Sequence, residues 1–340
     1  MNTAYKKKEM SPIQLQEKLF QEIKLKLPPH LSLVAAVSEL LDVSHDSVYR
    51  RVRGEKLLIL DEIYKLSSHF NISLDKLFQI NNNTFLFNGR IINNSDFNYE
   101  EWLKLCVQHL QQIADNPPNQ MYYLAKEIPF FYYFLIPEIA AFKSYFIMRS
   151  VLDYEDLKNA KFSLADDFGH YYKWCKKISD LFSSIPSTEI WHVENIRSTL
   201  HQIEYYKEIG SFASLDDVEI LYDKLIELID HIEQQAESGK KLTLGQEPTT
   251  SEVSYKMYKN ELTMGDNMQL IQIANAQIAY VNHSTINFLT TFDEDFSNYT
   301  KNNIDTIASK STPISVENQK DRLKFFNNLR NKVIEAKKQL

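Results

Sequence analysis

The chain has 340 residues, 44% of them hydrophobic and 24% charged, so it can bury a sizeable core and is long enough for two or three domains. Its net charge of −7 argues against indiscriminate nucleic-acid binding by the whole chain. With only seven glycines and ten prolines, a sandwich or barrel of many short strands is disfavoured and helices are expected.

The charge is unevenly distributed. Residues 1–80 hold 12 basic against 10 acidic residues, whereas the remaining chain holds 26 against 35. A basic face on the first segment can therefore still meet phosphate. The only cysteines, Cys106 and Cys175, are too few for a disulfide or metal framework, and a reducing, cytoplasmic compartment is expected.

Neither a signal peptide nor a membrane span is predicted. The basic cluster at residues 6–8 is followed by no apolar segment. The most membrane-like segment, residues 128–142, is interrupted by two prolines and is shorter than the roughly 20 apolar residues a span requires. A buried pair of aromatic-rich helices is expected there instead.

Five helices are predicted at the start of the chain. Residues 11–27 combine Ser11 as a cap, a proline at the first helical position and apolar residues every four positions. The other helices are expected at residues 31–41 with Ser32 as cap, at residues 44 to about 53 ended by Gly54, at 60–70 and at 72–78.

The remaining chain is expected to divide into three parts. Residues 81–96 are Asn-rich and predict a linker. Residues 97–245 have a helical pattern almost throughout, without a fixed repeat, and are expected to dimerise or to sense an effector. Alternation at 253–262 and 268–284, followed by two helical segments, predicts a small α+β domain over residues 250–340.

The second and third predicted helices meet the requirements of a helix-turn-helix unit. Such a unit has a short helix, a tight turn and a second helix whose exposed face enters the major groove of DNA. Small residues allow the two helices to approach, and apolar residues hold them together. The residues expected at this contact are Ala35, Ala36, Ser38, Leu41, Val43, Val48 and Val52.

LLDVSHDSVYRRVRG (40–54) and ILDEIYKLSSHFNISLDKLF (59–78) resemble the phage-repressor class of helix-turn-helix regulators, to which the lambda and 434 repressors and Cro belong. The resemblance covers about residues 10–78. Asp42 stands where the class often has glycine in the turn, and Arg51 and Val52 stand where it often has an apolar residue followed by glutamate.

The later segments KEIPFFYYFLIPEIAAFK, IPSTEIW, STINFLTTFD and KSTPIS are also similar to the C-terminal region of long bacterial regulators, for which no ligand is implied. The expected fold is therefore mainly α. It consists of a five-helix helix-turn-helix domain (1–80), a linker (81–96), a helical middle region (97–245) and a small α+β C-terminal domain (250–340).

The resemblance implies a sequence-specific transcriptional regulator that binds double-stranded DNA as a homodimer. The start of the third helix, from Ser44 to Tyr49, would face base edges, and Arg50 would bind guanine, contributing about 1–3 kcal/mol of discrimination. Arg51, Arg53 and Lys56 would hold phosphates. The complete set of predicted DNA-binding residues is Ser44, His45, Asp46, Ser47, Tyr49, Arg50, Arg51, Arg53 and Lys56.

Other candidate sites are weak, and no catalytic residue, metal or cofactor is expected. Three groups could place polar side chains on one helical face: Asp166, Asp167 and His170; Glu227 and His231; and Cys106 and His109. Such groups are more often surface pairs or buried cysteines than sites. The aromatic run at residues 130–134 is more often core, but it is where a small-molecule or peptide effector would be sought.

Two alternatives remain open. The first is a helical scaffold whose N-terminal region binds a protein partner. The second is an enzyme of unknown chemistry in the C-terminal half, which would require a polar, convergent pocket around His170 or His283.

Overall fold

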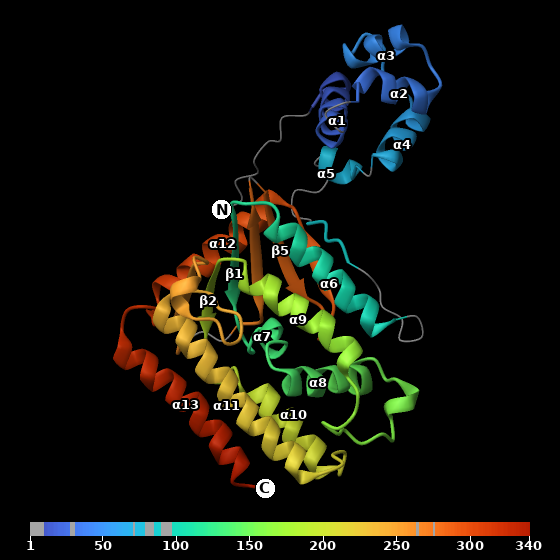
Figure 1. Ribbon diagram of the computed structural model, residues 1–340. Coiled ribbons are helices and arrows are strands. Elements are labelled where there is room, and N and C mark those ends of the chain that lie inside the picture. Colours follow the sequence, from blue (N-terminus) through green and yellow to red (C-terminus); the bar gives the residue numbers. More distant parts are fainter. Residues whose placement is uncertain are drawn as a thin grey trace, which may run out of the picture. The chain divides into compact units, whose positions relative to one another are not determined.

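The computed structural model describes residues 10–27, 31–70, 72–78, 85–89, 97–262, 265–274 and 276–340. Contacts divide the chain into two compact units, Met1–Leu86 and Phe87–Leu340, which we call the head and the body (Figure 1). The predicted linker, residues 81–96, lies mostly outside the described residues. No helix among the described residues is long and apolar enough to cross a membrane.

The head contains five helices at the predicted places. They are α1 (Pro12–Lys26), α2 (Leu33–Leu41), α3 (His45–Val52), α4 (Leu60–His69) and α5 (Leu74–Phe78). The Ser11 hydroxyl caps α1 by accepting a hydrogen bond from the backbone amide of Gln14, and the Gln14 side-chain oxygen accepts one from the backbone amide of Ser11. The core of the head consists of Leu19, Phe20, Ile23, Val37, Leu41, Val48, Leu66 and Leu77.

The turn between α2 and α3 is built from short polar residues. Asp42 closes α2 in the left-handed conformation, with φ of 52°, which Asp tolerates better than most residues. The Ser38 hydroxyl donates to the Val43 carbonyl at 2.6 Å. Ser32 occupies the N-cap position of α2 as predicted, but its side chain makes no cap hydrogen bond. The prediction for Ala35 is wrong, because this residue is exposed rather than enclosed between the helices.

Gln16 of α1 fixes the segment that follows α3. Its amide nitrogen donates to the carbonyls of Arg51 at 2.6 Å and Lys56 at 2.9 Å, and its oxygen accepts from the Leu58 amide at 2.6 Å. The side chain is 6% exposed, so these backbone groups have little access to water as a substitute partner. One buried amide thus determines where the chain leaves α3.

We expect Gln16→Leu to lower the stability of the head by about 2–3 kcal/mol, because three backbone groups lose a partner. Hydrogen exchange of peptides from residues 31–70 measures this loss. Gln21→Leu, at an exposed position of the same helix, is the matched control and should change exchange little. Equal protection in both variants would mean that Gln16 does not hold this segment.

The body is built on a seven-stranded mixed sheet with the order β6-β5-β4-β1-β2-β3-β7. The central strands β1, β2 and β3 are parallel, and the β1–β4, β4–β5, β5–β6 and β3–β7 pairs are antiparallel. The strands are β1 (Asn119–Leu124), β2 (Ser187–Trp191), β3 (Tyr255–Lys259), β4 (Met268–Ile273), β5 (Ala276–Asn282), β6 (Phe288–Thr291) and β7 (Thr312–Pro313).

This sheet corrects the predicted fold class. The fold is mixed α/β rather than mainly α, and the strands at 250–340 do not form a small C-terminal α+β domain. They pair with β1 and β2, which lie in the region expected to be helical almost throughout. The strands predicted at 253–262 and 268–284 are present as β3, β4 and β5. Their positions were therefore predicted correctly, whereas the strands with which they pair were not.

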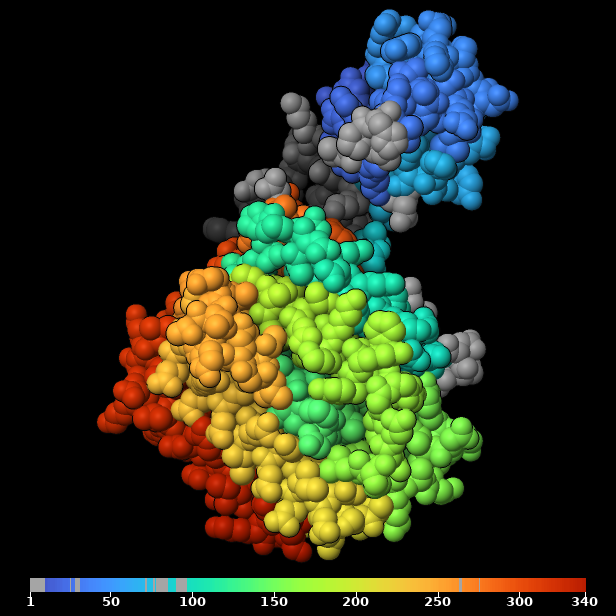
Figure 2. Space-filling view, in the orientation of Figure 1, coloured from blue at the N-terminus to red at the C-terminus, as the bar shows by residue number. Residues whose placement is uncertain are grey.

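Helices cover both faces of the sheet. On one face α12 (Glu294–Ser309) packs on β1, β4 and β5 over a small core that includes Leu124, Leu270 and Ile304. The larger core lies on the other face, where Figure 2 shows the teal, green and yellow segments of α6 (Tyr99–Ala114), α9 (Gly169–Ser183) and α11 (Leu215–Ser238) forming the surface. The remaining helices are α7 (Phe130–Tyr133), α8 (Pro137–Phe146), α10 (Arg197–Glu208) and α13 (Gln319–Lys337), with short helical turns at Ile147–Val151, Glu155–Leu157 and Pro248–Thr250.

Lys143 of α8 is buried among neutral partners. Its ammonium donates to Thr199 Oγ1 at 2.8 Å and Gln202 Oε1 at 2.7 Å, and lies 4.1 Å from the centre of the Tyr133 ring. Burial lowers the pKa of Lys143 to about 7. The folded protein therefore releases this proton about three pH units before the unfolded chain does.

We expect the free energy of unfolding to rise with pH between about 7 and about 10 because of Lys143. In that window the unfolded chain still binds the proton and the folded protein does not, so higher pH favours folding. Lys143→Met should remove the contribution of Lys143 and make the rise smaller, leaving that of Lys241, whose pKa burial also lowers. Lys104→Met, at the more accessible position on α6, should retain the full rise. Urea unfolding followed by tryptophan fluorescence at several pH values checks the prediction, and parallel profiles for the two variants would refute it.

Candidate nucleic-acid interface

One face of α3 is exposed over its whole length. Seven of the nine predicted DNA-binding residues lie on this face or at its ends: Ser44, His45, Asp46, Tyr49, Arg50, Arg53 and Lys56. Val48, on the opposite face, is fully buried in the core of the head. The Ser44 hydroxyl caps the helix by accepting a hydrogen bond from the Ser47 amide, as predicted.

The cationic side chains of this face make only weak contacts within the head. Glu55 Oε2 lies 3.8 Å from Arg50 Nε, and Glu55 Oε1 lies 3.7 Å from Arg53 Nη1. The two arginine side chains are 56% and 66% exposed, and such surface pairs contribute about 0–1 kcal/mol. Arg50 and Arg53 can therefore exchange Glu55 for a phosphate or a base at little cost.

Arg51, predicted to hold a phosphate, differs from the other arginines because it is buried in this conformation. The residue is only 2% exposed. Its guanidinium forms a bidentate ion pair with Glu62 of α4, with Arg51 Nε 3.1 Å from Oε2 and Arg51 Nη2 2.5 Å from Oε1. It also donates to the Ser47 carbonyl at 3.0 Å. The chain uses this arginine to hold α3 against α4.

The other partners of this ion pair are polar groups of α3 and α4. Ser47, predicted to face bases, is partly buried, and its hydroxyl accepts from Arg51 Nη1. Glu62 also accepts from the Ile59 amide at 3.2 Å at the start of α4. The hydrogen bond from Arg51 lowers the pKa of the Glu62 carboxyl. Ser47 is therefore better placed to orient Arg51 than to read a base.

An apolar strip follows the end of α3. Leu57, Ile59, Leu60 and Tyr64 are 48%, 60%, 81% and 68% exposed. Large apolar side chains exposed together on a small unit are typical of a protein contact. This strip was not predicted from the sequence.

The body contains a buried polar cluster that was also not predicted. The Glu189 carboxylate of β2 is fully buried, and it accepts from Ser187 Oγ at 2.9 Å, Trp191 Nε1 at 2.9 Å and Tyr132 Oη at 3.0 Å. Lys241 Nζ lies 3.2 Å from Glu189 Oε1 and 3.1 Å from Tyr132 Oη. Burial lowers the pKa of Lys241 to about 8.

No lining residue of the cavities described below belongs to this cluster. Every atom of the Glu189 carboxylate is already occupied by groups of the protein itself. A substrate would have to displace these partners, so we interpret the cluster as a structural network.

Two of the three weaker sequence candidates are not brought together as sites, whereas Cys106 and His109 both line the larger cavity described below. Asp166, Asp167 and His170 are exposed, and the Asp167 carboxylate accepts from the Gly169 amide at 2.8 Å. Glu227 pairs with Lys224, whereas His231 is buried against the Leu242 carbonyl. Within the described residues, no three His, Cys, Asp or Glu side chains converge as a metal site would require.

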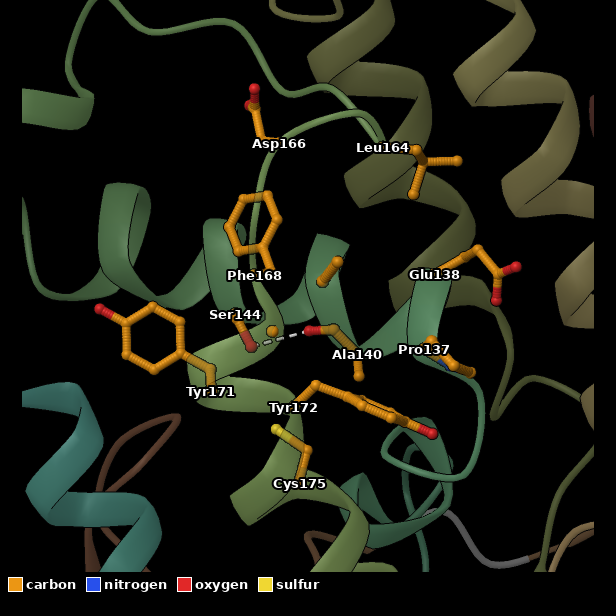
Figure 3. Close-up of a pocket in the computed structure, with 12 residues that line it drawn as sticks. Pro137, Glu138, Ala140, Ser144, Leu164, Asp166, Phe168, Tyr171, Tyr172 and Cys175 are labelled. Carbon is orange, nitrogen blue, oxygen red and sulfur yellow. Dashed lines mark hydrogen bonds between the residues drawn. The ribbon is translucent and has the colours of Figure 1, made fainter.

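Among the described residues, three cavities in the body are large enough for a small molecule. One, of about 320 Å³ between α10 and α13, is lined mostly by charged side chains. The other two contain residues singled out from the sequence. The smaller, of about 310 Å³, lies between α8 and α9, where Figure 3 shows Phe168, Tyr171 and Tyr172 around the Ser144–Ala140 hydrogen bond of 2.7 Å. The larger, of about 720 Å³, lies between α6 and the sheet and includes Phe130 and Phe131. These two phenylalanines belong to the run predicted to border an effector pocket, and Tyr132, Tyr133 and Phe134 lie in the core.

Both cysteines border these cavities without being activated. Cys106 lines the larger cavity and Cys175 the smaller one. Burial raises the pKa of each thiol to about 12, so neither is a thiolate near neutral pH.

No known protein family, curated protein or solved structure matches this chain.

Proposed function

We propose that this protein is a sequence-specific DNA-binding transcriptional regulator that places α3 in the major groove. The observation that carries the proposal is the division of α3 into two faces. Val48 and Arg51 fix the helix to the head, while Tyr49, Arg50 and Arg53 point outward. A short helix, a tight turn and a second helix with a free polar face are the parts that major-groove readers use.

Within this proposal the exposed residues have different roles. Arg50, near the middle of the exposed face, would read a base, and Arg53 and Lys56 at its end would hold phosphates. His45, Asp46 and Tyr49 would face base edges from the first turns of the helix. The proposed assembly is a homodimer that binds a two-fold symmetric site, and the strip of Leu57, Ile59, Leu60 and Tyr64 is the surface of the head best suited to a second copy.

Arg50→Ala should weaken binding to the preferred DNA sequence by about 1–3 kcal/mol and relax the preference at one base pair. Lys56→Ala should weaken binding to all sequences alike and reduce the salt dependence by about one phosphate contact. Gel-shift titrations with selected and scrambled DNA compare the two, with Lys65→Ala on α4 as control. If all three variants bound like the unsubstituted protein, α3 would not be the reading helix.

The second candidate function is that of a scaffold protein whose head binds a protein partner. The exposed apolar strip favours it, because Leu60 is 81% exposed and Tyr64 68%. Leu60→Ser distinguishes the proposals: it should lower dimer formation in sedimentation while each copy keeps salt-dependent DNA binding. A chain that binds no DNA at any salt concentration would leave the scaffold as the better account.

A further inference from the structure

The larger cavity of the body has walls from four separate parts of the chain. Helix α6 contributes Trp102, Cys106 and His109. The sheet contributes Gln269, Ile271, Tyr280 and Phe288, α7 contributes Phe130 and Phe131, and Asn88 and Gly89 complete the wall. Figure 1 shows α6 alongside β5, and a hydrogen bond between His109 Nε2 and Tyr280 Oη joins them. Its volume of about 720 Å³ is within the range of pockets that enclose small ligands.

Among the residues that the structure describes, the lining of this cavity carries no formal charge near neutral pH. None of its lining residues is Asp, Glu, Lys or Arg. Of the described lining residues, His109 is the one that could become positively charged, but burial lowers the pKa of His109 below its usual value. A phosphate, a carboxylate or an ammonium ion would lose its water here without gaining a counter-ion. The cavity therefore selects against charged ligands.

One buried polar side chain in the cavity is poorly satisfied among the described residues. Gln269 is only 6% exposed, and among the described residues its side chain donates only to the thioether of Met121, at 3.5 Å. A thioether is a weak acceptor, so the amide keeps donor and acceptor capacity that a buried group normally uses. Trp102, by contrast, donates its indole N–H to the Ile286 carbonyl at 3.2 Å. Gln269 is thus the group that would fix the orientation of a ligand.

We propose that this cavity binds an uncharged, largely apolar small molecule that carries a single carbonyl or hydroxyl group. Trp102, Phe130, Phe131 and Phe288 contact its aromatic or aliphatic body, and Gln269 hydrogen-bonds its oxygen. A peptide fits this lining less well, because each of its amide groups needs a partner and Trp102, His109 and Tyr280 are already hydrogen-bonded within the protein.

The cavity also contacts the segment that enters the body after the head. The boundary between the two units falls at Leu86 and Phe87, and Asn88 and Gly89 line the cavity. Asn88 is paired with Thr290 of β6, with bonds of 2.7 Å from Asn88 N and 2.8 Å from Thr290 N. A ligand that displaced this pairing would free Asn88 from β6, two residues after the boundary with the head, so we propose that the cavity is an effector site. This step rests on the proposed function.

Binding can be tested with two dyes that share a ring system and differ in charge. N-phenyl-1-naphthylamine is neutral, and 8-anilinonaphthalene-1-sulfonate adds one sulfonate. In fluorescence titrations of the full chain, we expect the neutral dye to bind about ten-fold more tightly, because the sulfonate finds no counter-ion. Equal binding, or tighter binding of the sulfonate, would overturn the proposed selectivity.

Variants place the bound dye in the structure. Leu105, 39% exposed, lines the cavity, so Leu105→Trp should block entry without disturbing the core and should weaken neutral-dye binding about ten-fold. Leu215→Trp, at a 59% exposed position away from the cavity, is the matched control. Gln269→Leu should weaken a ketone-bearing neutral dye such as Nile red more than naphthylamine. Unchanged binding in Leu105→Trp would place the dye elsewhere and refute the site.

A DNA titration separates the effector role from the proposed function. With the neutral dye saturating, we expect the apparent affinity of the full chain for its selected DNA to change about three-fold or more, and Leu105→Trp to abolish the change. Dye binding with unchanged DNA affinity would overturn the effector role. No DNA binding in the absence of dye would instead contradict the proposed function and leave the dye result standing.

Discussion

Arg51→Met should lower the stability of the head by about 3 kcal/mol, although Arg51 belongs to the most arginine-rich segment of the chain. The substitution leaves Glu62 without its charged partner, and removing one member of a buried ion pair costs about 3–5 kcal/mol. We expect the lower end of this range because the Glu62 side chain remains 12% exposed. DNA binding should fall only as far as the head unfolds.

A second substitution separates a structural role of Arg51 from a binding role. Arg51→Met with Glu62→Leu replaces the pair with apolar side chains and should recover most of the stability and the DNA affinity. Arg53→Met, two residues away and exposed, should change stability by less than about 0.5 kcal/mol while weakening DNA binding. Since Trp102, Trp174 and Trp191 all lie in the body, hydrogen exchange of head peptides is the suitable measurement.

Loss of affinity in the stable double variant would contradict this account. Arg51 would then contact DNA directly, and the ion pair with Glu62 would have to open on binding. Wild-type affinity in the double variant would establish that DNA binding does not require Arg51. The other three cations between residues 50 and 56, which are Arg50, Arg53 and Lys56, would then be sufficient for it.

Lys241→Met should destabilise the body by about 3–5 kcal/mol, because Glu189 is left as a buried carboxylate without a cation. The neutral donors Ser187, Tyr132 and Trp191 remain, but they do not balance its charge. The Lys241 ammonium also lies 3.3 Å from the centre of the Phe182 ring, so this favourable contact is lost as well. Urea unfolding followed by tryptophan fluorescence reports the change.

The neighbouring residue supplies the control. Lys240 pairs with Glu252 at 3.1 Å, but the Glu252 side chain is 92% exposed, so Lys240→Met should cost about 0–1 kcal/mol. Glu189→Gln combined with Lys241→Met should recover part of the loss, because the buried negative charge is removed too. Similar losses for Lys240→Met and Lys241→Met would mean that the buried pair contributes no special stability.

The head could be predicted in detail because its signals are local. Ser11, Ser44 and Gly54 mark helix ends through interactions within a few residues, and the structure places helices at each of these points. The role of Arg51 was missed although a signal was present. Arg51 and Val52 follow Val48 by three and four residues, so all three lie on one face of the helix. A helix that turns this face to the core must also bury the arginine.

The body could be predicted only as a series of elements. Strands β1 and β2 are six and five residues long and lie between helices, with helices on both faces of the sheet. Their pairing partners are up to about 150 residues away in the sequence, and no local pattern encodes such a distance. The Glu189 cluster was missed for the same reason, since β2, β3, α7 and the segment after α11 each contribute to it.

Whether α3 reads DNA is tested most directly by selecting bound DNA from a random library with the full chain. The selected sequence is then titrated at increasing salt. We expect an enriched motif of two symmetric half-sites and an affinity that falls about a thousand-fold between about 50 and about 200 mM salt, if six or more phosphates are contacted. Arg50→Ala should select a motif relaxed at one position of each half-site. No enriched sequence, together with binding that does not depend on salt, would contradict the proposal that α3 reads DNA.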